Sequence, residues 1–210
     1  MQYTKEDIQQ MDRVKRLKLI NSVSGIKPAN LIGTIDDKGK TNLAIFSSVL
    51  HLGSEPAVLG FIVRPIGEVP RHTYENIMSN GLYTINHVHS SFIKEAHYTS
   101  AKFDREESEF SACNLHEEFV TDFKAPFVKE SLLKMGMKFL EAIPLAVNGT
   151  ILVIGEIQHL LVAQEAFTED DDINLETIGG VGISGLNTYY DLEKKNRYPF
   201  ARLNEVPDFN

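Results

Sequence analysis

Two neighbouring hydroxyl side chains are the first feature of this sequence that could hold a ligand. Ser47 and Ser48 close the stretch of residues 41–48, TNLAIFSS, which is expected to be a strand running into a loop. Hydroxyl groups and the backbone N–H groups beside them can bind a phosphate at such a point. A Ser-Ser pair is also common in ordinary turns, so the pair does not predict a site without further features.

Features that favour an anion follow the two serines along the chain. Arg64 stands before Pro65 at the expected end of a strand, and its guanidinium could hold a phosphate through two hydrogen bonds. A helix is expected over His72–Asn80, and the N–H groups of its first turn, at His72 and Thr73, would face an anion with the positive end of the helix dipole. Arg64 alone is better explained by a surface ion pair, but the three features together predict an anion site.

A third cluster combines small polar side chains with aromatic ones. Residues 97–103 read HYTSAKF, and residues 107–110 read ESEF. Donors and acceptors beside aromatic side chains suit a flat polar ring whose edge needs hydrogen bonds. Taken alone, the cluster is more typical of a loop that an aromatic side chain anchors to the core.

Composition sets limits on the class of protein. The chain has 210 residues, a net charge of −8 and one cysteine, Cys113. The acidic balance argues against a protein that coats nucleic acid, and a single cysteine excludes an internal disulfide framework and fits a reducing cytosol. The polar start and the lack of a long apolar run predict no signal peptide and no membrane span. We therefore expect a cytoplasmic protein without a nucleic-acid or membrane partner.

The hydrophobic pattern predicts many short strands and a few short helices. Apolar residues at every third position predict a helix over residues 4–19, in an N-terminal arm of residues 1–20. Short helices or turns are expected at residues 92–97 and 105–111, and an extended tail at residues 198–210. Strands are predicted over residues 31–35, 42–49, 58–64, 83–88, 115–120, 134–141, 146–154 and 157–163. This pattern predicts a mainly β fold, an antiparallel barrel that is closed or partly closed.

Two other patterns carry less weight. Residues 180–185, GVGISG, fit a dinucleotide-binding glycine pattern, but an acidic polar segment precedes them and no helix is predicted to follow. We expect a flexible loop there instead. His87 and His89 would lie on one face of a strand, but no third ligand stands at metal-binding spacing, so no metal site is predicted.

The ordered motifs resemble one known family. They are TNLAIFSS, PAVLGFIVRP, RHTYENI, GLYTINHV, AHYTSAKF and SEF, all between about residues 25 and 110. This series resembles the flavin reductase-like domain family, whose fold is the FMN-binding split barrel. The resemblance implies one split-barrel domain over residues 1–210, bound FMN and a homodimer in which the second subunit completes the flavin site.

The resemblance also implies a set of cofactor-binding residues. Arg64, His72 and Thr73 match positions on the phosphate side, and residues 99–102 match a segment that approaches the ring or the partner subunit's phosphate. Residues 185–190 match a late loop beside the flavin. The full implied set is Asn42, Phe46, Ser47, Ser48, Arg64, Pro65, His72, Thr73, Asn76, Thr99, Ser100, Ala101, Lys102, Asn187 and Tyr189.

The implied activity is that of an FMN-dependent oxidoreductase of flavin-reductase type, with NAD(P)H as a candidate donor and a small molecule or a protein as redox partner. One departure matters. Many reductases of the family carry Gly-Asp-His before a late strand, where this chain reads Val147-Asn148-Gly149-Thr150. Two alternatives therefore stay open: an FMN-binding electron carrier without its own NAD(P)H site, and a barrel that binds another phosphate ligand without redox chemistry. No catalytic side chain is assigned.

Overall fold

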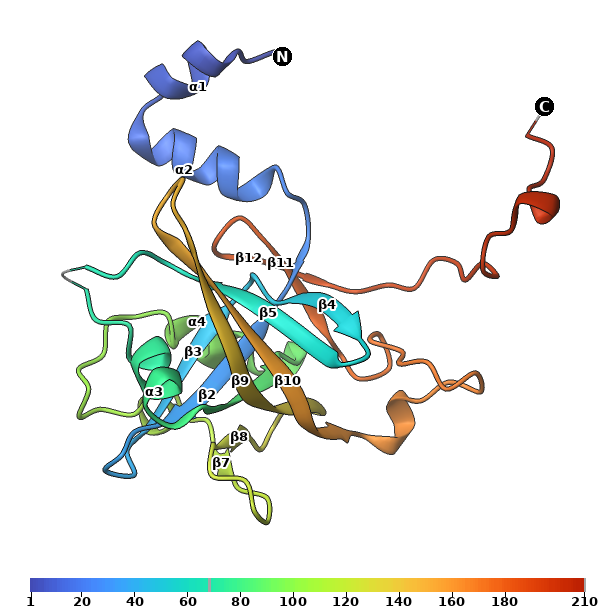
Figure 1. Ribbon diagram of the computed structural model, residues 1–210. Coiled ribbons are helices and arrows are strands. Elements are labelled where there is room, and N and C mark those ends of the chain that lie inside the picture. Colours follow the sequence, from blue (N-terminus) through green and yellow to red (C-terminus); the bar gives the residue numbers. More distant parts are fainter. Residues whose placement is uncertain (68, 210) are drawn as a thin grey trace.

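A curved sheet of seven strands forms the centre of the computed structural model, which describes residues 1–67 and 69–209 (Figure 1). The strand order is β3-β2-β6-β9-β10-β5-β4, and each neighbouring pair is antiparallel. The strands are β2 (Asn30–Ile35), β3 (Thr41–Phe46), β4 (Leu50–Ser54), β5 (Ala57–Val63), β6 (Leu82–His87), β9 (Leu133–Leu145) and β10 (Thr150–Val162).

The connection between β3 and β4 forces this sheet to roll up. These two strands stand at opposite ends of the strand order, yet only residues 47–49 separate them in the chain. A link of that length cannot span a flat seven-stranded sheet, because strands lie about 4.8 Å apart. The ends must therefore approach each other, and because β3 and β4 do not pair, the barrel is split along this seam.

Side chains that alternate along the strands fill the barrel interior. Ile32, Phe61, Tyr83 and Ile85 are fully buried in one cluster, and Phe46 reaches across the seam to pack edge-on against Phe61, with ring centroids 5.1 Å apart. The alternate residues of β2 and β3 belong to a second cluster on the opposite face. That face is covered by two short helices, α4 (Ile93–Tyr98) and α5 (Glu109–Ala112).

Long, bulged strands let the sheet curve. β9 and β10 pair along most of their length, with register shifts at Ile154/Gly155 and Ile157/His159. Bulges bend a strand and increase its twist. Gly155 also makes room for the core, because a Cβ there would lie 2.2 Å from the hydroxyl of Tyr83.

Smaller elements surround the barrel. β1 (Lys27–Pro28), β11 (Val181–Ser184) and β12 (Thr188–Asp191) form a three-stranded sheet, and β7 (Glu117–Glu118) pairs with β8 (Phe127–Val128). α3 (His72–Asn80) has the bounds predicted from the sequence and ends at Gly81, whose φ of +75° gives the left-handed cap. Thr73 and Ile77 are buried on its inner face.

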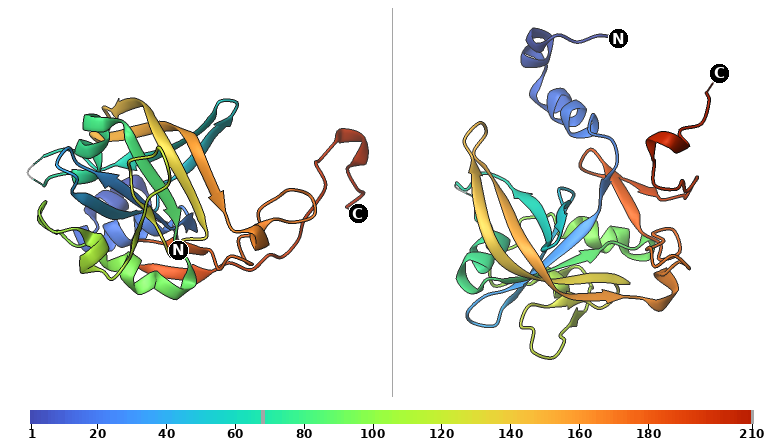
Figure 2. Two further views of the ribbon diagram at one scale, coloured as in Figure 1. Left: turned by 90° about the horizontal axis from the view of Figure 1, so that it is seen from below. Right: turned by 45° about the vertical axis from the view of Figure 1, so that its right-hand side comes forward.

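The two terminal segments extend away from the barrel (Figures 1 and 2). At the N-terminus, α1 (Lys5–Gln10) and α2 (Arg13–Ser22) contain no buried residue. At the C-terminus, the tail exposes large apolar side chains, among them Tyr198, Phe200 and Leu203. No helix within the described residues is long and apolar enough to cross a membrane.

The structure confirms the predicted fold class and corrects several predicted elements. The single helix predicted over residues 4–19 is two helices, because Asp12 caps a new one by accepting hydrogen bonds from the N–H groups of Val14 and Lys15. The strands predicted at 146–154 and 157–163 are one strand, β10, since bulges interrupt its alternation without ending it. The predicted flexible loop at residues 180–185 contains β11, whose first three residues are buried.

The close packing of β2 gives a testable prediction for stability. A Cβ at Gly33 would lie 2.3 Å from the carbonyl oxygen of Pro126 and 2.6 Å from Oγ1 of Thr84. We expect Gly33→Ala to lower the free energy of unfolding by about 1–3 kcal/mol, because the backbone must shift to relieve the overlap. Urea denaturation measures this change. Gly67→Ala is the control, since a Cβ there meets nothing within 4 Å; equal midpoints for the two variants would contradict the prediction.

Candidate functional site

A large hollow opens at the barrel seam. It has a volume of about 1110 Å³ and lies between the end of β3, the end of β5, the start of α3 and the segment of residues 99–105. We call it the seam cleft. Of the residues implied by the sequence, it is lined by Asn42, Phe46, Ser47, Ser48, Arg64, His72, Thr73, Thr99, Ser100, Ala101 and Lys102.

A buried polar network supports the start of α3 at the cleft wall. The amide of Asn42 donates a hydrogen bond to Oγ1 of Thr73 at 3.1 Å. Asn76 donates to Oγ1 of Thr34, also at 3.1 Å, and accepts a hydrogen bond from Arg105 at 3.3 Å. All four uncharged residues of this network are buried. Neutral buried groups that bond one another fix the helix start in place, and β2 and β3 thereby determine where its first turn points.

The first turn of α3 offers N–H donors to the cleft. The first hydrogen bond within the helix runs from Glu75 N–H to the carbonyl of Arg71, at 2.9 Å. Within the described residues, no hydrogen bond takes the N–H groups of His72, Thr73 or Tyr74. Three such donors at the positive end of a helix dipole are a ready site for an anion.

Several cationic side chains stand around this turn. Arg64 forms no ion pair with any residue that the structure describes, and neither does Lys102. Arg71 bonds the carbonyl of Pro65 through Nη2 at 3.3 Å, and Arg105 forms an ion pair with Glu75. The cleft therefore holds two cations that are available to a ligand and two that are already held in position.

The two serines at the seam differ in what they do. Ser48 Oγ accepts a hydrogen bond from the N–H of Ile62 at 3.0 Å, which ties the end of β3 to β5. Ser47 makes no side-chain hydrogen bond within the described residues and lines the cleft. Ser48 is thus a structural tie across the seam, while the hydroxyl of Ser47 is available to a ligand.

Residues 99–102 form a turn on the opposite wall. The Thr99 hydroxyl donates to the carbonyl of Ala96 at 2.7 Å, and the N–H groups of Ser100 and Ala101 bond the carbonyls of His97 and Tyr98. These bonds hold the turn, from which Ser100 and Lys102 line the cleft.

Glu109, at the start of α5, places a buried carboxyl in the cleft. Its side chain is only 6% exposed, and Oε2 accepts a hydrogen bond from the N–H of Leu43 at 2.8 Å. Burial raises the pKa of this carboxyl above its ordinary value. The SEF motif predicts no contact for Glu109, because nothing in the local sequence pattern indicates that this side chain turns inward.

Four residues implied by the resemblance do not line the seam cleft. Pro65 contributes its carbonyl to Arg71, and Asn76 lies behind the wall as part of the buried network. Asn187 and Tyr189 line a separate open hollow beside α4, where Oη of Tyr189 lies 3.0 Å from Nδ1 of His97. Burial raises the pKa of Tyr189 to about 12. Of the late loop, Leu186 reaches the seam cleft instead.

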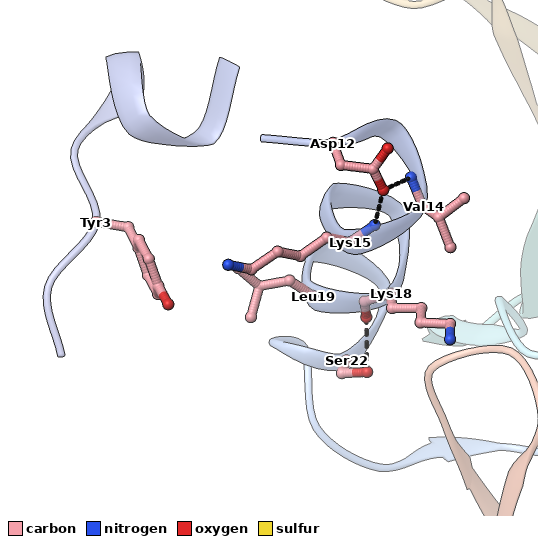
Figure 3. Close-up of a pocket in the computed structure, with 7 residues that line it drawn as sticks. All are labelled: Tyr3, Asp12, Val14, Lys15, Lys18, Leu19 and Ser22. Carbon is pink, nitrogen blue, oxygen red and sulfur yellow. Dashed lines mark hydrogen bonds between the residues drawn. The ribbon is translucent and has the colours of Figure 1, made fainter. Parts of the chain in front are cut away.

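A further hollow lies within the N-terminal arm and is unrelated to the seam cleft (Figure 3). It lies between the first residues of the chain and α2, with Lys15 Nζ 5.8 Å from the ring centroid of Tyr3. No group of three potential metal ligands comes together in the part of the chain that the structure describes. Neither finding adds a second functional site.

Comparison with solved structures gives the same fold. A Shewanella frigidimarina protein described as a flavin reductase with split barrel domain is 52% identical and superimposes with a TM-score of 0.92, over 96% of this chain and 100% of that one. Flavoredoxin of Desulfovibrio vulgaris is 20% identical with a TM-score of 0.73, over 84% and 92% of the two chains. An FMN-binding protein from Thermus thermophilus is 12% identical with a TM-score of 0.71, over 85% and 93%.

Comparison with family models connects the sequence to the cleft. The model of the flavin reductase like domain matches residues 26–178, which include the seam and most of the residues around the cleft. The match, the split barrel and the solved structure at 52% identity agree with one another. This chain belongs to the flavin reductase-like domain family, and its fold is a split barrel of the kind found in flavin reductases.

Proposed function

We propose that the seam cleft binds FMN and that the protein is an oxidoreductase of flavin-reductase type. The observation that carries the proposal is that one end of the broad seam cleft has the groups of an anion-binding site. The first turn of α3, Arg64 and Lys102 supply donors and positive charge, and the cleft of about 1110 Å³ has room for a flavin nucleotide. The family to which the chain belongs favours a flavin over other phosphate ligands.

The protein's part in this proposal is binding and orientation. A bound flavin would itself supply the electron-transfer chemistry. Arg64, Lys102 and the N–H groups of His72 and Thr73 would hold the phosphate, and Asn42 keeps the wall beside them fixed by its bond to Thr73. Asn42, Phe46 and Ser47 from β3 and its end, with Thr99 and Ser100 from the opposite turn, would border the rest of the ligand.

A second candidate function, an FMN-binding electron carrier, differs from a flavin reductase in its electron donor. Where many family members carry Gly-Asp-His, this chain reads Val147-Asn148-Gly149-Thr150, which forms the turn after β9 and the first residue of β10. That replacement favours an electron carrier that binds FMN and receives electrons from a protein, and a flavoredoxin is among the proteins of similar fold. A cytoplasmic location remains a prediction from the single cysteine.

Titration of the purified protein with FMN tests the proposal, followed by anaerobic addition of NADH or NADPH. Binding of FMN with quenched flavin fluorescence supports the flavin site. Bleaching of the visible flavin band by NADH or NADPH then supports a reductase. If the band stays but a reduced protein donor bleaches it, the carrier is supported. If FMN does not bind at all, the flavin proposal is wrong and a barrel for another phosphate ligand remains.

Replacement of Arg64 tests the anchor. We expect Arg64→Ala to weaken FMN binding by about 1.5–3 kcal/mol, or roughly 10- to 150-fold, because a charge-assisted hydrogen bond to the phosphate is lost. Fluorescence titration of the apoprotein measures the dissociation constant. Lys5→Ala in the N-terminal arm removes one positive charge far from the cleft and serves as control. An Arg64→Ala variant that binds FMN like the parent would remove Arg64 from the anchor.

A homodimer is part of the proposal. The outer face of β4, β5 and β10 lies at the front of Figure 1 without a helix over it, and Leu52 and Leu152 pack there over Gly60. Leu50 and Leu52 stay about 40% exposed (41% and 40%), which is typical of a face that another chain covers.

We expect a mass in solution of about twice 23.6 kDa, measured by light scattering after size-exclusion chromatography. Leu52→Glu should shift the protein toward the monomer, because it would bury a charge in the interface. Asp37→Ala in an exposed turn is the control. A parent protein that is monomeric at all concentrations tested would refute the dimer.

A further inference from the structure

Glu109 is a cleft residue whose chemistry the anion site does not explain. A carboxylate repels a phosphate, yet Glu109 lines the same cleft and is a buried residue, with only 6% of its surface exposed. A buried carboxyl that lacks a cationic partner is costly unless hydrogen bonds satisfy it. The buried carboxyl of Glu109 therefore requires hydrogen-bond donors.

The structure supplies only part of what this carboxyl can accept. Leu43 N–H donates to Oε2 at 2.8 Å, and the carboxyl also interacts with its own backbone N–H. A carboxylate has about four acceptor positions, so two remain. No basic side chain within the described residues forms an ion pair with it. Arg105, the nearest arginine in sequence, is held by Glu75 and Asn76.

The groups around Glu109 are either acidic or uncharged. Glu107, two residues away, raises the pKa of Glu109 further. Burial raises the pKa of the Cys113 thiol, and Glu109 raises it further. The side chains beside its backbone, Ser108 and Thr41, bond each other and Glu117. None of these groups offers the carboxyl a donor, and Glu109 lines the cleft.

The edge of β3 beside Glu109 is also unpaired. Leu43 turns its N–H away from β2, and alternation in an antiparallel ladder means that the N–H and carbonyl of Ile45 do the same. β3 is the last strand on its side of the sheet, and Ile45 lines the cleft. An acceptor at Glu109 and a donor at Ile45 therefore stand in a row along one strand edge.

We propose that Glu109 accepts a hydrogen bond from the imide N–H of the flavin ring, and so selects a ligand that carries a donor as well as an anion. The proposal rests on the flavin site proposed above. An imide edge alternates acceptor, donor and acceptor, which is the pattern that a row of donor and acceptor groups along a strand edge can match. A ligand with a phosphate but no such donor would leave the carboxyl unsatisfied.

The variant that tests this is Glu109→Gln. In this variant the amide oxygen must keep accepting the hydrogen bond from the N–H of Leu43, so the NH2 group faces the cleft. Two donors, this NH2 group and the imide N–H of the flavin, then oppose each other. Glu107→Gln is the matched control, because it removes the same charge two residues away on an exposed side chain. Each apoprotein is titrated with FMN and with FMN methylated at the imide nitrogen.

The parent and Glu107→Gln should bind FMN about 10- to 100-fold more tightly than the methylated flavin, the scale of a charge-assisted hydrogen bond. Glu109→Gln should bind FMN about 10- to 100-fold more weakly than the parent. In this variant, methylation of the imide nitrogen should weaken flavin binding by less than about threefold. Equal methylation costs in the parent and in Glu109→Gln would overturn the proposal, as would a parent that binds both flavins alike.

The outcomes also separate this inference from the proposed function. A parent that binds FMN while Glu109→Gln behaves identically refutes only the assignment of Glu109. A parent that binds neither flavin refutes the flavin site itself. If circular dichroism shows that Glu109→Gln does not fold, Glu109→Asp replaces it, since that variant keeps the carboxyl and shortens it. Weaker FMN binding with a smaller methylation cost supports the proposal, and parent-like values for both overturn it.

Discussion

The short link between β3 and β4 is the constraint from which the rest of this structure follows. Because residues 47–49 join strands at opposite ends of the sheet, the sheet can satisfy its connectivity only by rolling until those ends meet. The two ends meet without pairing, so the barrel keeps a seam, and the hydrogen bond from Ile62 N–H to Ser48 Oγ ties it at one point. An unpaired strand edge normally invites aggregation, and here it borders the cleft.

The same seam explains why two opposite charges can share one cleft. The cationic end is assembled by α3, whose first turn the Asn42–Thr73 bond fixes to β3. The carboxyl of Glu109 is held on the outward edge of that same strand by the N–H of Leu43. β3 thus positions both groups, and Glu109 forms no ion pair with a cation among the described residues. A ligand that satisfies both must itself carry an anion and a donor.

The sequence predicted the parts of the molecule that local patterns encode. The helix His72–Asn80 and its Gly81 cap, the split-barrel class and the gathering of the two serines, Arg64 and the helix start in one place all agree with the structure. Contacts that depend on distant parts of the chain were not predictable. The use of Ser48 as a tie to Ile62, and the inward turn of Glu109 onto Leu43, join residues far apart in sequence whose types alone do not reveal a partner.

In the late loop, residues 185–190, the structure differs from what the family resemblance implies. Asn187 and Tyr189 match a loop expected beside the flavin, yet they lie in the hollow beside α4, and Leu186 alone of that loop reaches the cleft. The pairing of β11 with β12 holds Thr188 opposite Ser184, so residues 185–187 form a tight connection that brings only Leu186 to the cleft. Since His97 contacts Tyr189 and the turn at residues 99–101 begins directly after α4, this hollow is connected to the cleft wall through a single helix. Changes at Tyr189 would therefore act on the cleft through the position of α4.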